Sequence, residues 1–119
     1  MKKMIILIGL VFTFSATAGS IQRMTVTDMA PVEDMYASFE IVTPKYDKVI
    51  LDCQSFINGM NFYKNKKIVH AIRMVDYDTC SNVYDFIDQS LKQKKAICME
   101  IEEGSSSLNL SNDEASECQ

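Results

Sequence analysis

Four cysteines constrain the fold of this 119-residue chain more than any other feature of its sequence. They are Cys53, Cys80, Cys98 and Cys118, so none lies in the first 52 residues. An even number of cysteines in a short exported chain favours two disulfides, each typically worth about 2–4 kcal/mol of stability. The alternative is a metal site, but no cysteine pair has Cys-x-x-Cys spacing and His70 is the only histidine. The pattern therefore predicts two disulfides, with no bound metal or other cofactor.

Residues 1–18 predict a cleaved export signal. Two lysines precede an apolar run at 4–14, and Ala16-Thr17-Ala18 supplies the small residues that signal peptidase needs, so we expect cleavage after Ala18. The apolar run is too short for the roughly 20 residues of a membrane-spanning helix, and no later stretch is long enough either. The sequence therefore predicts an exported protein, periplasmic or extracellular, with no transmembrane segment after cleavage.

The acidic balance of the chain bears on its partners. Its net charge is −4, and removal of Lys2 and Lys3 with the signal would leave about −6. Contacts to phosphates supply most of the affinity of nucleic-acid binders, and they need basic side chains. We therefore expect no nucleic-acid partner.

Residues 36–75 show the alternation that is typical of half-buried strands. We expect strands at 36–43, 48–56, 60–63 and 68–75. The dipeptide Asn58-Gly59 suits the positive φ angles of a two-residue hairpin turn between the second and third strands. The preceding residues, 19–35, predict an irregular entry segment with at most a short edge strand near 24–26.

A helix is predicted to follow, because apolar residues recur at helical spacing from Cys80 to Leu91. Either Asp78 or Thr79 can cap its first turn. Alternation returns at 96–103, and a last strand is expected at 107–110.

The resulting order is β-β-β-β-α-β-β, with tight turns between neighbouring strands. Such turns join antiparallel strands, and one helix on one face makes the fold class α+β. We expect an antiparallel sheet of about five to six strands, one domain spanning 36–111, and an acidic tail at 112–119 tied by Cys118.

This topology also ranks the possible disulfide pairings. The strand through Cys53 ends beside the start of the helix, where Cys80 lies on the apolar stripe. A bond between Cys80 and Cys98 would have to span the helix, roughly 20 Å, whereas bonded cysteines have Cα atoms within about 7 Å. We therefore predict the pairs Cys53–Cys80 and Cys98–Cys118, the second holding the tail.

Catalytic candidates are few. His70 is the first choice for acid–base chemistry, and Asp52, a carboxylate inside a strand, is the second. Together they could serve a small secreted hydrolase. However, His70 lies on the apolar side of its strand, and no serine lies in a Gly-x-Ser-x-Gly motif.

Two lysine-rich runs provide a different kind of candidate site. The first is Lys64-Asn65-Lys66-Lys67 and the second is Lys92-Gln93-Lys94-Lys95. The predicted topology places both at the end of the sheet opposite the start of the helix. Turns are often polar and helix ends favour lysine, but a cluster of all six could also contact an anionic surface. The candidate anion contacts are Lys64, Lys66, Lys67, Lys92, Lys94 and Lys95.

The function expected from these patterns is non-catalytic binding. We expect a binding or inhibitor module acting on an unidentified protein through its sheet face or loops. Phe56, Tyr63 and Phe86 fall off the apolar faces, and a partly exposed aromatic patch can mark an interface. The alternatives are the hydrolase using His70 and Asp52, and an envelope protein attached to a polyanion through its lysine-rich end.

Overall fold

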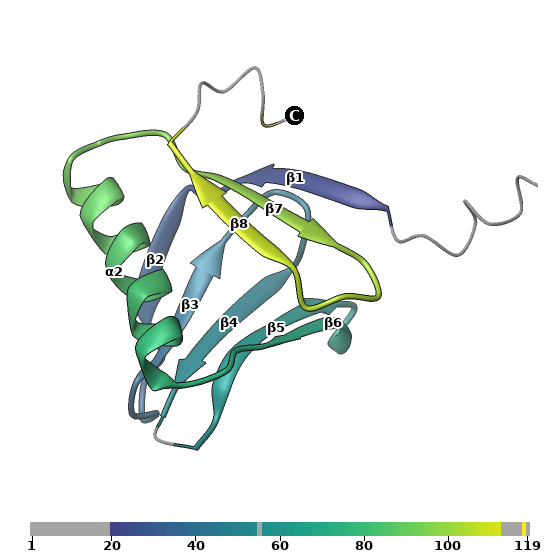
Figure 1. Cartoon of the computed structure of the whole chain (residues 1–119), viewed down its shortest axis with the longest axis horizontal. Coiled ribbons are helices and arrows are strands. Elements are labelled where there is room, and N and C mark those ends of the chain that lie inside the picture. The colour runs from purple at the N-terminus through teal and green to yellow at the C-terminus, as the bar shows by residue number, and fades with distance from the viewer. Residues whose placement is uncertain (1–19, 55, 113–117, 119) are drawn as a thin grey trace, which may run out of the picture.

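The structure is a computed structural model that describes residues 20–54, 56–112 and 118 (Figure 1). The predicted signal peptide with its cleavage site after Ala18, and most of the acidic tail, lie outside the described residues. The described part holds eight strands and one helix: β1 Ile21–Thr25, β2 Asp28–Pro31, β3 Ser38–Val42, β4 Lys48–Cys53, β5 Asn58–Lys64, β6 Lys67–Arg73, α2 Tyr77–Lys92, β7 Cys98–Glu102 and β8 Leu108–Ser111.

The strands form two antiparallel sheets. One has five strands in the order β2-β3-β4-β5-β6, and the other has three in the order β1-β7-β8. Helix α2 and the three-stranded sheet both lie over one face of the five-stranded sheet (Figure 1). The α+β class, the single helix and the order β-β-β-β-α-β-β from residue 36 onward are confirmed.

The entry segment 19–35 needs correction, because it holds two regular strands rather than an irregular chain. Strand β1 pairs with β7 along its whole length, and Arg23 forms a cross-strand salt bridge with Glu100 at 2.9 Å. Met24 is buried, whereas its neighbours Gln22 and Arg23 are not. Because only one residue of β1 is buried, its sequence shows no alternation of apolar and polar residues that would predict a strand.

The turn predicted at Asn58-Gly59 also lies elsewhere. Both residues belong to β5, where they pair with Cys53 and Asp52, and the reversal is made by residues 54–57. The two-residue hairpin turn is instead Asn65-Lys66, where both residues have positive φ angles of 53° and 66°. This geometry is that of the primed turns whose twist suits a hairpin.

Helix α2 starts earlier than its apolar stripe indicates. Its cap is Asp76, not Asp78 or Thr79: the Asp76 carboxylate accepts hydrogen bonds from the backbone N–H of Thr79 at 2.9 Å and from the Thr79 hydroxyl at 2.8 Å. This arrangement satisfies one of the unpaired N–H groups of the first turn. The connection from β6 to α2 is therefore only three residues long, 74–76.

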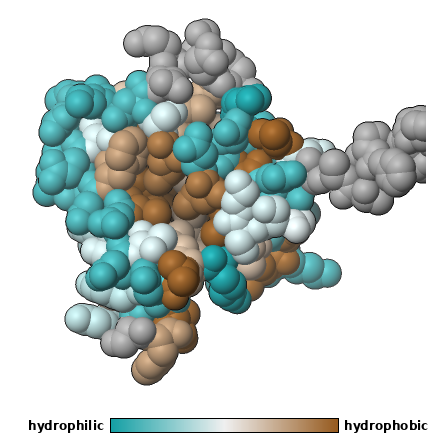
Figure 2. Space-filling model, in the orientation of Figure 1, coloured by the Kyte–Doolittle hydropathy of each residue, from teal (hydrophilic) through white to brown (hydrophobic). Residues whose placement is uncertain are grey.

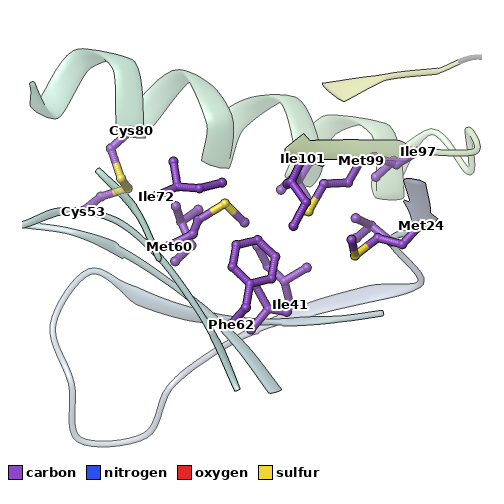
Figure 3. Packing of buried hydrophobic residues seen from close by; sticks show 14 residues of the cluster. Met24, Ile41, Cys53, Met60, Phe62, Ile72, Cys80, Ile97, Met99 and Ile101 are labelled. Carbon is purple, nitrogen blue, oxygen red and sulfur yellow. A yellow bond between two sulfur atoms is a disulfide. The ribbon is translucent and has the colours of Figure 1, made fainter. Parts of the chain in front are cut away.

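The core lies between the five-stranded sheet on one side and α2 with the three-stranded sheet on the other (Figure 3). Its largest fully buried side chain is Phe62 of β5, which is surrounded by aliphatic and methionine side chains. These come from all layers: Ile41, Leu51, Met60 and Ile72 from the five-stranded sheet, Ile87 from α2, and Met24, Met99 and Ile101 from the three-stranded sheet.

Both predicted disulfides are present. Cys53–Cys80 joins the end of β4 to the first turns of α2, with Cα atoms 5.5 Å apart. Cys98–Cys118 joins the start of β7 to the tail, with Cα atoms 5.4 Å apart. All four cysteines are buried.

Candidate functional site

One end of the five-stranded sheet carries three loops, 32–37, 54–57 and 74–76, which together with Tyr77, the first residue of α2, we call the loop end. These loops join β2 to β3, β4 to β5, and β6 to α2. Residue 55 lies outside the described part. In Figure 1 the three loops lie together at the bottom of the molecule, beside the N-terminus of α2.

Backbone hydrogen bonds and a disulfide hold these loops to the sheet. The N–H of Cys53 donates to the carbonyl of Ala37 at 2.9 Å, and the N–H of Met74 donates to the carbonyl of Asn58 at 3.0 Å. The middle loop closes on itself through the N–H of Gln54 and the carbonyl of Ile57, 2.8 Å apart. The Cys53–Cys80 bond then fixes this loop to the helix. The described residues of the loop end therefore form a platform that is tied to the sheet.

Large apolar side chains point into solvent from this platform. Six of the ten exposed large hydrophobic residues in the described part of the chain lie there: Met35, Tyr36, Phe56, Ile57, Val75 and Tyr77. Tyr36, Phe56 and Val75 are 82–86% exposed. Brown and tan surface is visible at the same end in Figure 2. Exposed apolar side chains are unremarkable singly, but a cluster of them marks an interaction surface.

A hollow lies between two of the loops. It has a volume of about 530 Å³ and is lined by residues of 56–58 and 73–77. Its wall is apolar on the side of Phe56, Ile57 and Val75, and Asp76 and Arg73 supply charge. The hollow could hold one protruding side chain of a partner.

Carboxylates surround the apolar cluster. Glu33, Asp34, Asp76 and Asp78 are exposed on the loops or the first turn of α2, against one arginine, Arg73. The hydrogen bonds from Thr79 hold the pKa of Asp76 below its usual value near 3.8, so this carboxylate stays ionised. The loop end therefore combines an apolar centre with a negative rim.

The opposite end of the same sheet, which we call the turn end, is basic. It consists of the connection 43–47, the first residue of β4, and the turn 64–67. Five lysines lie on it, all exposed: Lys45, Lys48, Lys64, Lys66 and Lys67. Lys48 pairs across the strands with Tyr63, and Lys64 pairs with Lys67, so the two segments are adjacent.

The predicted six-lysine cluster is wrong in composition. Lys64, Lys66 and Lys67 are at the turn end, but Lys92, Lys94 and Lys95 follow the C-terminus of α2, at a separate part of the molecule (Figure 1). Lys92 there forms a salt bridge with Asp88 at 2.9 Å. The helix does not run along the strand direction from one end of the sheet to the other, so its C-terminus does not reach the turn end.

Lys45 and Lys48 take their place and were missed. A signal for them was present, because antiparallel strands put alternate connections at the same end of a sheet. The connections after the strands 36–43 and 60–63 must therefore share an end. Lys45 and Lys48 stand singly in the sequence and form no Lys-x-Lys-Lys run, so only this shared end of the sheet links them to the lysines of 64–67.

Two hollows flank the turn 64–67. One of about 500 Å³ is lined by Asp47, Lys48, Tyr63, Asn65 and Lys66. The other, of about 400 Å³, includes Lys45, Tyr46, Lys64 and Glu103. Burial, followed by the negative charge of Glu103, raises the pKa of the Tyr46 hydroxyl, which donates a hydrogen bond to Gln22 at 3.2 Å.

His70 and Asp52 are not brought together. Asp52 lies on the outer face of β4, opposite the buried Val49, Leu51 and Cys53, and accepts hydrogen bonds from Ser38 and Gln54, both at 2.9 Å. His70 pairs with Phe62 on the core side, and the two rings lie tilted at 53° to each other with centroids 5.3 Å apart. The two residues therefore lie on opposite faces of the sheet. Their side chains cannot act together as an acid–base pair, which needs groups within hydrogen-bond reach of one substrate.

A second apolar area lies along the seam between α2 and β8, where Figure 2 shows brown surface at the centre of the view. A hollow of about 250 Å³ there is lined chiefly by Val83 and Phe86 of α2 and by Leu108 and Leu110 of β8. All four are only partly exposed and pack against the core cluster. This seam is the edge of the core, whereas the apolar side chains of the loop end are 48–86% exposed.

Known proteins give no guide to these surfaces. Comparisons with protein-family models, with curated proteins and with solved structures find no match to the chain. Among the residues that the structure describes, no group of three or more potential metal-ligating side chains is found. None of the described helices is long and apolar enough to cross a membrane.

Proposed function

We propose that this protein is an exported, non-catalytic binding module that holds a protein partner on its loop end. The observation that carries the proposal is the gathering of six exposed apolar side chains on three loops that backbone hydrogen bonds and a disulfide fix to the sheet. A rigid surface loses little conformational entropy on binding, so more of its contact energy is available as affinity.

The layout of the loop end is that of a protein interface. Such interfaces have an apolar, aromatic-rich centre and a polar rim that stays in contact with water. Tyr36, Phe56 and Tyr77 are of the type that dominates binding energy, because they bury a large area with few rotatable bonds. The carboxylates of Glu33, Asp34, Asp76 and Asp78 provide the rim.

The charge of this rim selects the chemistry of the partner. Four carboxylates against Arg73 repel anionic surfaces and attract cationic ones. The partner we propose is a protein with an apolar patch bordered by lysine or arginine. The same charge disfavours insertion of the loops into a membrane with anionic lipids, which would otherwise suit exposed aromatic residues.

Export is part of the proposal. It is supported by the charged, apolar and small-residue segments of residues 1–18 and by the two disulfides, which favour a compartment outside the reducing cytoplasm. Binding rather than catalysis is supported by the separation of His70 and Asp52 on opposite faces of the sheet.

The test uses the oxidised mature chain, immobilised and exposed to the proteins of its own secretome and envelope. Two variants each replace two exposed apolar side chains by serine: Phe56→Ser with Val75→Ser at the loop end, and Ile68→Ser with Val69→Ser on β6, whose side chains are 53% and 55% exposed. Any retained protein is then purified and titrated against all three chains. We expect the loop-end variant to bind it more than about tenfold more weakly and the β6 variant to bind it normally.

A second pair of variants tests the charge of the rim. Glu33→Gln with Asp78→Asn removes two rim carboxylates, and Asp85→Asn with Glu102→Gln removes two elsewhere. The first pair should weaken binding of the purified partner, most at low salt, and the second should not. The proposal fails if no protein is retained, if the partner is acidic, or if the loop-end and control variants bind equally.

A further inference from the structure

We propose that the turn end is a second binding site, and that it binds an anionic polysaccharide. This goes beyond the proposed function, because it concerns the opposite end of the sheet, a different class of ligand and different residues.

The first support is the way in which the fold gathers the lysines. Lys45 and Lys48 come from the connection between β3 and β4, whereas Lys64, Lys66 and Lys67 come from the turn between β5 and β6. The pairing of β4 with β5 places these segments side by side, so charges about 20 residues apart in sequence share one surface. Because Lys48, Lys64 and Lys67 are fixed by hydrogen-bonded ladders, most of the cluster is preorganised.

The second support is that these lysines form no salt bridge within the described residues. Within the described residues the salt bridges are Arg23–Glu100 and Lys92–Asp88, neither at the turn end. The carboxylates that line the same hollows accept other hydrogen bonds: Asp47 from the N–H of Asn65 at 2.7 Å, and Glu103 from Gln22 at 2.6 Å. In a chain with an excess of acidic residues, five unpaired and adjacent lysines repel one another, and an anionic ligand relieves that repulsion.

The third support is the shape of the surface. The two hollows lie on either side of the turn, one holding Lys48 and Lys66 and the other holding Lys45 and Lys64. Consecutive residues such as Tyr63 and Lys64 line different hollows, which places the hollows on opposite faces of the sheet. A ligand with charges spaced along a flexible chain can reach both, whereas a single small anion can reach one.

The aromatic residues of the turn end distinguish between classes of polyanion. Proteins that bind single-stranded nucleic acid stack bases on free aromatic faces. Here Tyr46 packs edge-on against Phe62 with centroids 5.0 Å apart, and the Lys48 ammonium lies 5.8 Å from the centre of the Tyr63 ring. The turn end thus presents cations but no free aromatic face on which a nucleic-acid base could stack. This favours a polyanion that has no bases.

A bilayer is the other common polyanion, and the turn does not suit it. The residues at the tip are Asn65 and Lys66, both polar and exposed, so no apolar side chain leads the surface. Stable attachment to a membrane normally needs an apolar anchor in addition to a basic patch. An anionic polysaccharide needs only the spaced cations.

The experiment measures the affinity of the oxidised mature chain for heparin, a sulfated polysaccharide, and for alginate, a carboxylated one. Neutral dextran, single-stranded DNA and phosphatidylglycerol vesicles are measured beside them. We expect binding to heparin and alginate that weakens with added salt, no binding to dextran, and much weaker binding to DNA and vesicles.

Two variants with equal charge change locate the site. Lys64→Gln with Lys66→Asn alters the turn end, and Lys95→Gln with Lys94→Asn alters the helix end. The asparagines replace residues with positive φ angles of 66° and 58°, which asparagine tolerates, so both variants should fold. The turn-end variant should bind the polysaccharides about tenfold more weakly, whereas the helix-end variant should bind as the unaltered chain does.

Three results would overturn the proposal: no salt-dependent binding to either polysaccharide, equal weakening by both variants, or tighter binding to DNA or vesicles. The loop-end variant Phe56→Ser with Val75→Ser separates this proposal from the proposed function. It should retain the affinity for the polysaccharides while losing the protein partner, so either function can fail without the other.

Discussion

The two ends of the five-stranded sheet share their strands but differ in every surface property. The loop end has three connections of three to six residues, exposed aromatic and aliphatic side chains, and a rim of carboxylates. The turn end has a two-residue hairpin turn and a short connection, and its exposed side chains are mainly lysines. The difference shows that one scaffold can carry two independent surfaces, because antiparallel strands deliver alternate connections to opposite ends.

The two ends also differ in what keeps them ordered. At the turn end the ladder between β5 and β6 continues to the pair Lys64–Lys67, so the turn is held by the strands themselves. At the loop end the connections extend past the ladder, and the Cys53–Cys80 disulfide replaces the missing strand pairing. The proposed polysaccharide site at the turn end therefore lies on regular strand structure, whereas the proposed protein-binding site at the loop end depends on a disulfide.

Removal of the Cys53–Cys80 disulfide should have the largest effect on this comparison. In Cys53→Ala with Cys80→Ala, the free energy of unfolding should fall by about 2–4 kcal/mol, since the unfolded chain gains freedom and two buried contacts are lost. The loop end should become sensitive to protease and lose its protein partner, while polysaccharide binding at the turn end persists in the folded fraction. Urea unfolding, limited proteolysis and the two binding assays measure these outcomes.

The matched control is Cys98→Ala with Cys118→Ala. Its loop of 20 residues is close in length to the 27 residues of the other pair, so the loss of stability should be similar. Binding by the folded fraction should be unaffected at either end, because this disulfide is distant from both. Equal damage to loop-end binding by both variants would show that the disulfide next to the loops has no local role.

Gly59 is the next most sensitive position. It lies in β5 at the loop end, where a Cβ atom would collide with the backbone carbonyl of Ile72 on β6. Because backbone cannot move aside as a flexible side chain can, Gly59→Ala should lower the free energy of unfolding by about 1–3 kcal/mol. The measurement is urea unfolding, and an unchanged midpoint would show that β5 and β6 can separate freely at this end.

The glycine also shows what the sequence could and could not predict. The dipeptide Asn58-Gly59 was interpreted as a turn, the commonest reason for that pair, but here glycine is needed for close approach of two strands. The actual two-residue turn is Asn65-Lys66, where lysine occupies a position that usually favours glycine. Turn propensity thus identified the hairpin between β4 and β5 but placed its reversal a few residues too late, at 58–59 rather than at 54–57.

The strong patterns were sufficient for the fold class and for both disulfides. Alternation and helical spacing gave the seven elements from residue 36 onward, and their order fixed which cysteines could meet. What failed was the angle of α2 to the strands, which no local pattern encodes. It was that angle which separated Lys92, Lys94 and Lys95 from the turn end.

The cap of α2 should have a smaller effect and one that depends on pH. The pKa of Asp76 is lowered in the folded chain, so its ionised form stabilises the fold above the unfolded pKa near 3.8, and that contribution is lost as the pH falls through the folded pKa. Asp76→Ala should lower the melting temperature at pH 7 and reduce its fall below about pH 4. Asp76→Asn should keep most of the melting temperature at pH 7, because asparagine also caps helices, yet lack the acid-dependent step. A full acid-dependent step in the asparagine variant would assign that step to other carboxylates.

The smallest effect, and the sharpest comparison, is expected from Lys66→Gly at the turn end. Lysine at a φ angle of 66° is conformationally unfavourable, and the resulting Asn-Gly pair is the preferred two-residue hairpin turn. The substitution should therefore raise the free energy of unfolding by about 0.5–1 kcal/mol while weakening polysaccharide binding, since it removes one of the five cations. Lys94→Gly, which also relieves a positive φ angle of 58°, should stabilise the chain without weakening that binding. A chain that becomes more stable and binds less only when Lys66 is changed would show that this position keeps a strained lysine for its charge, as a binding site does and a structural turn does not.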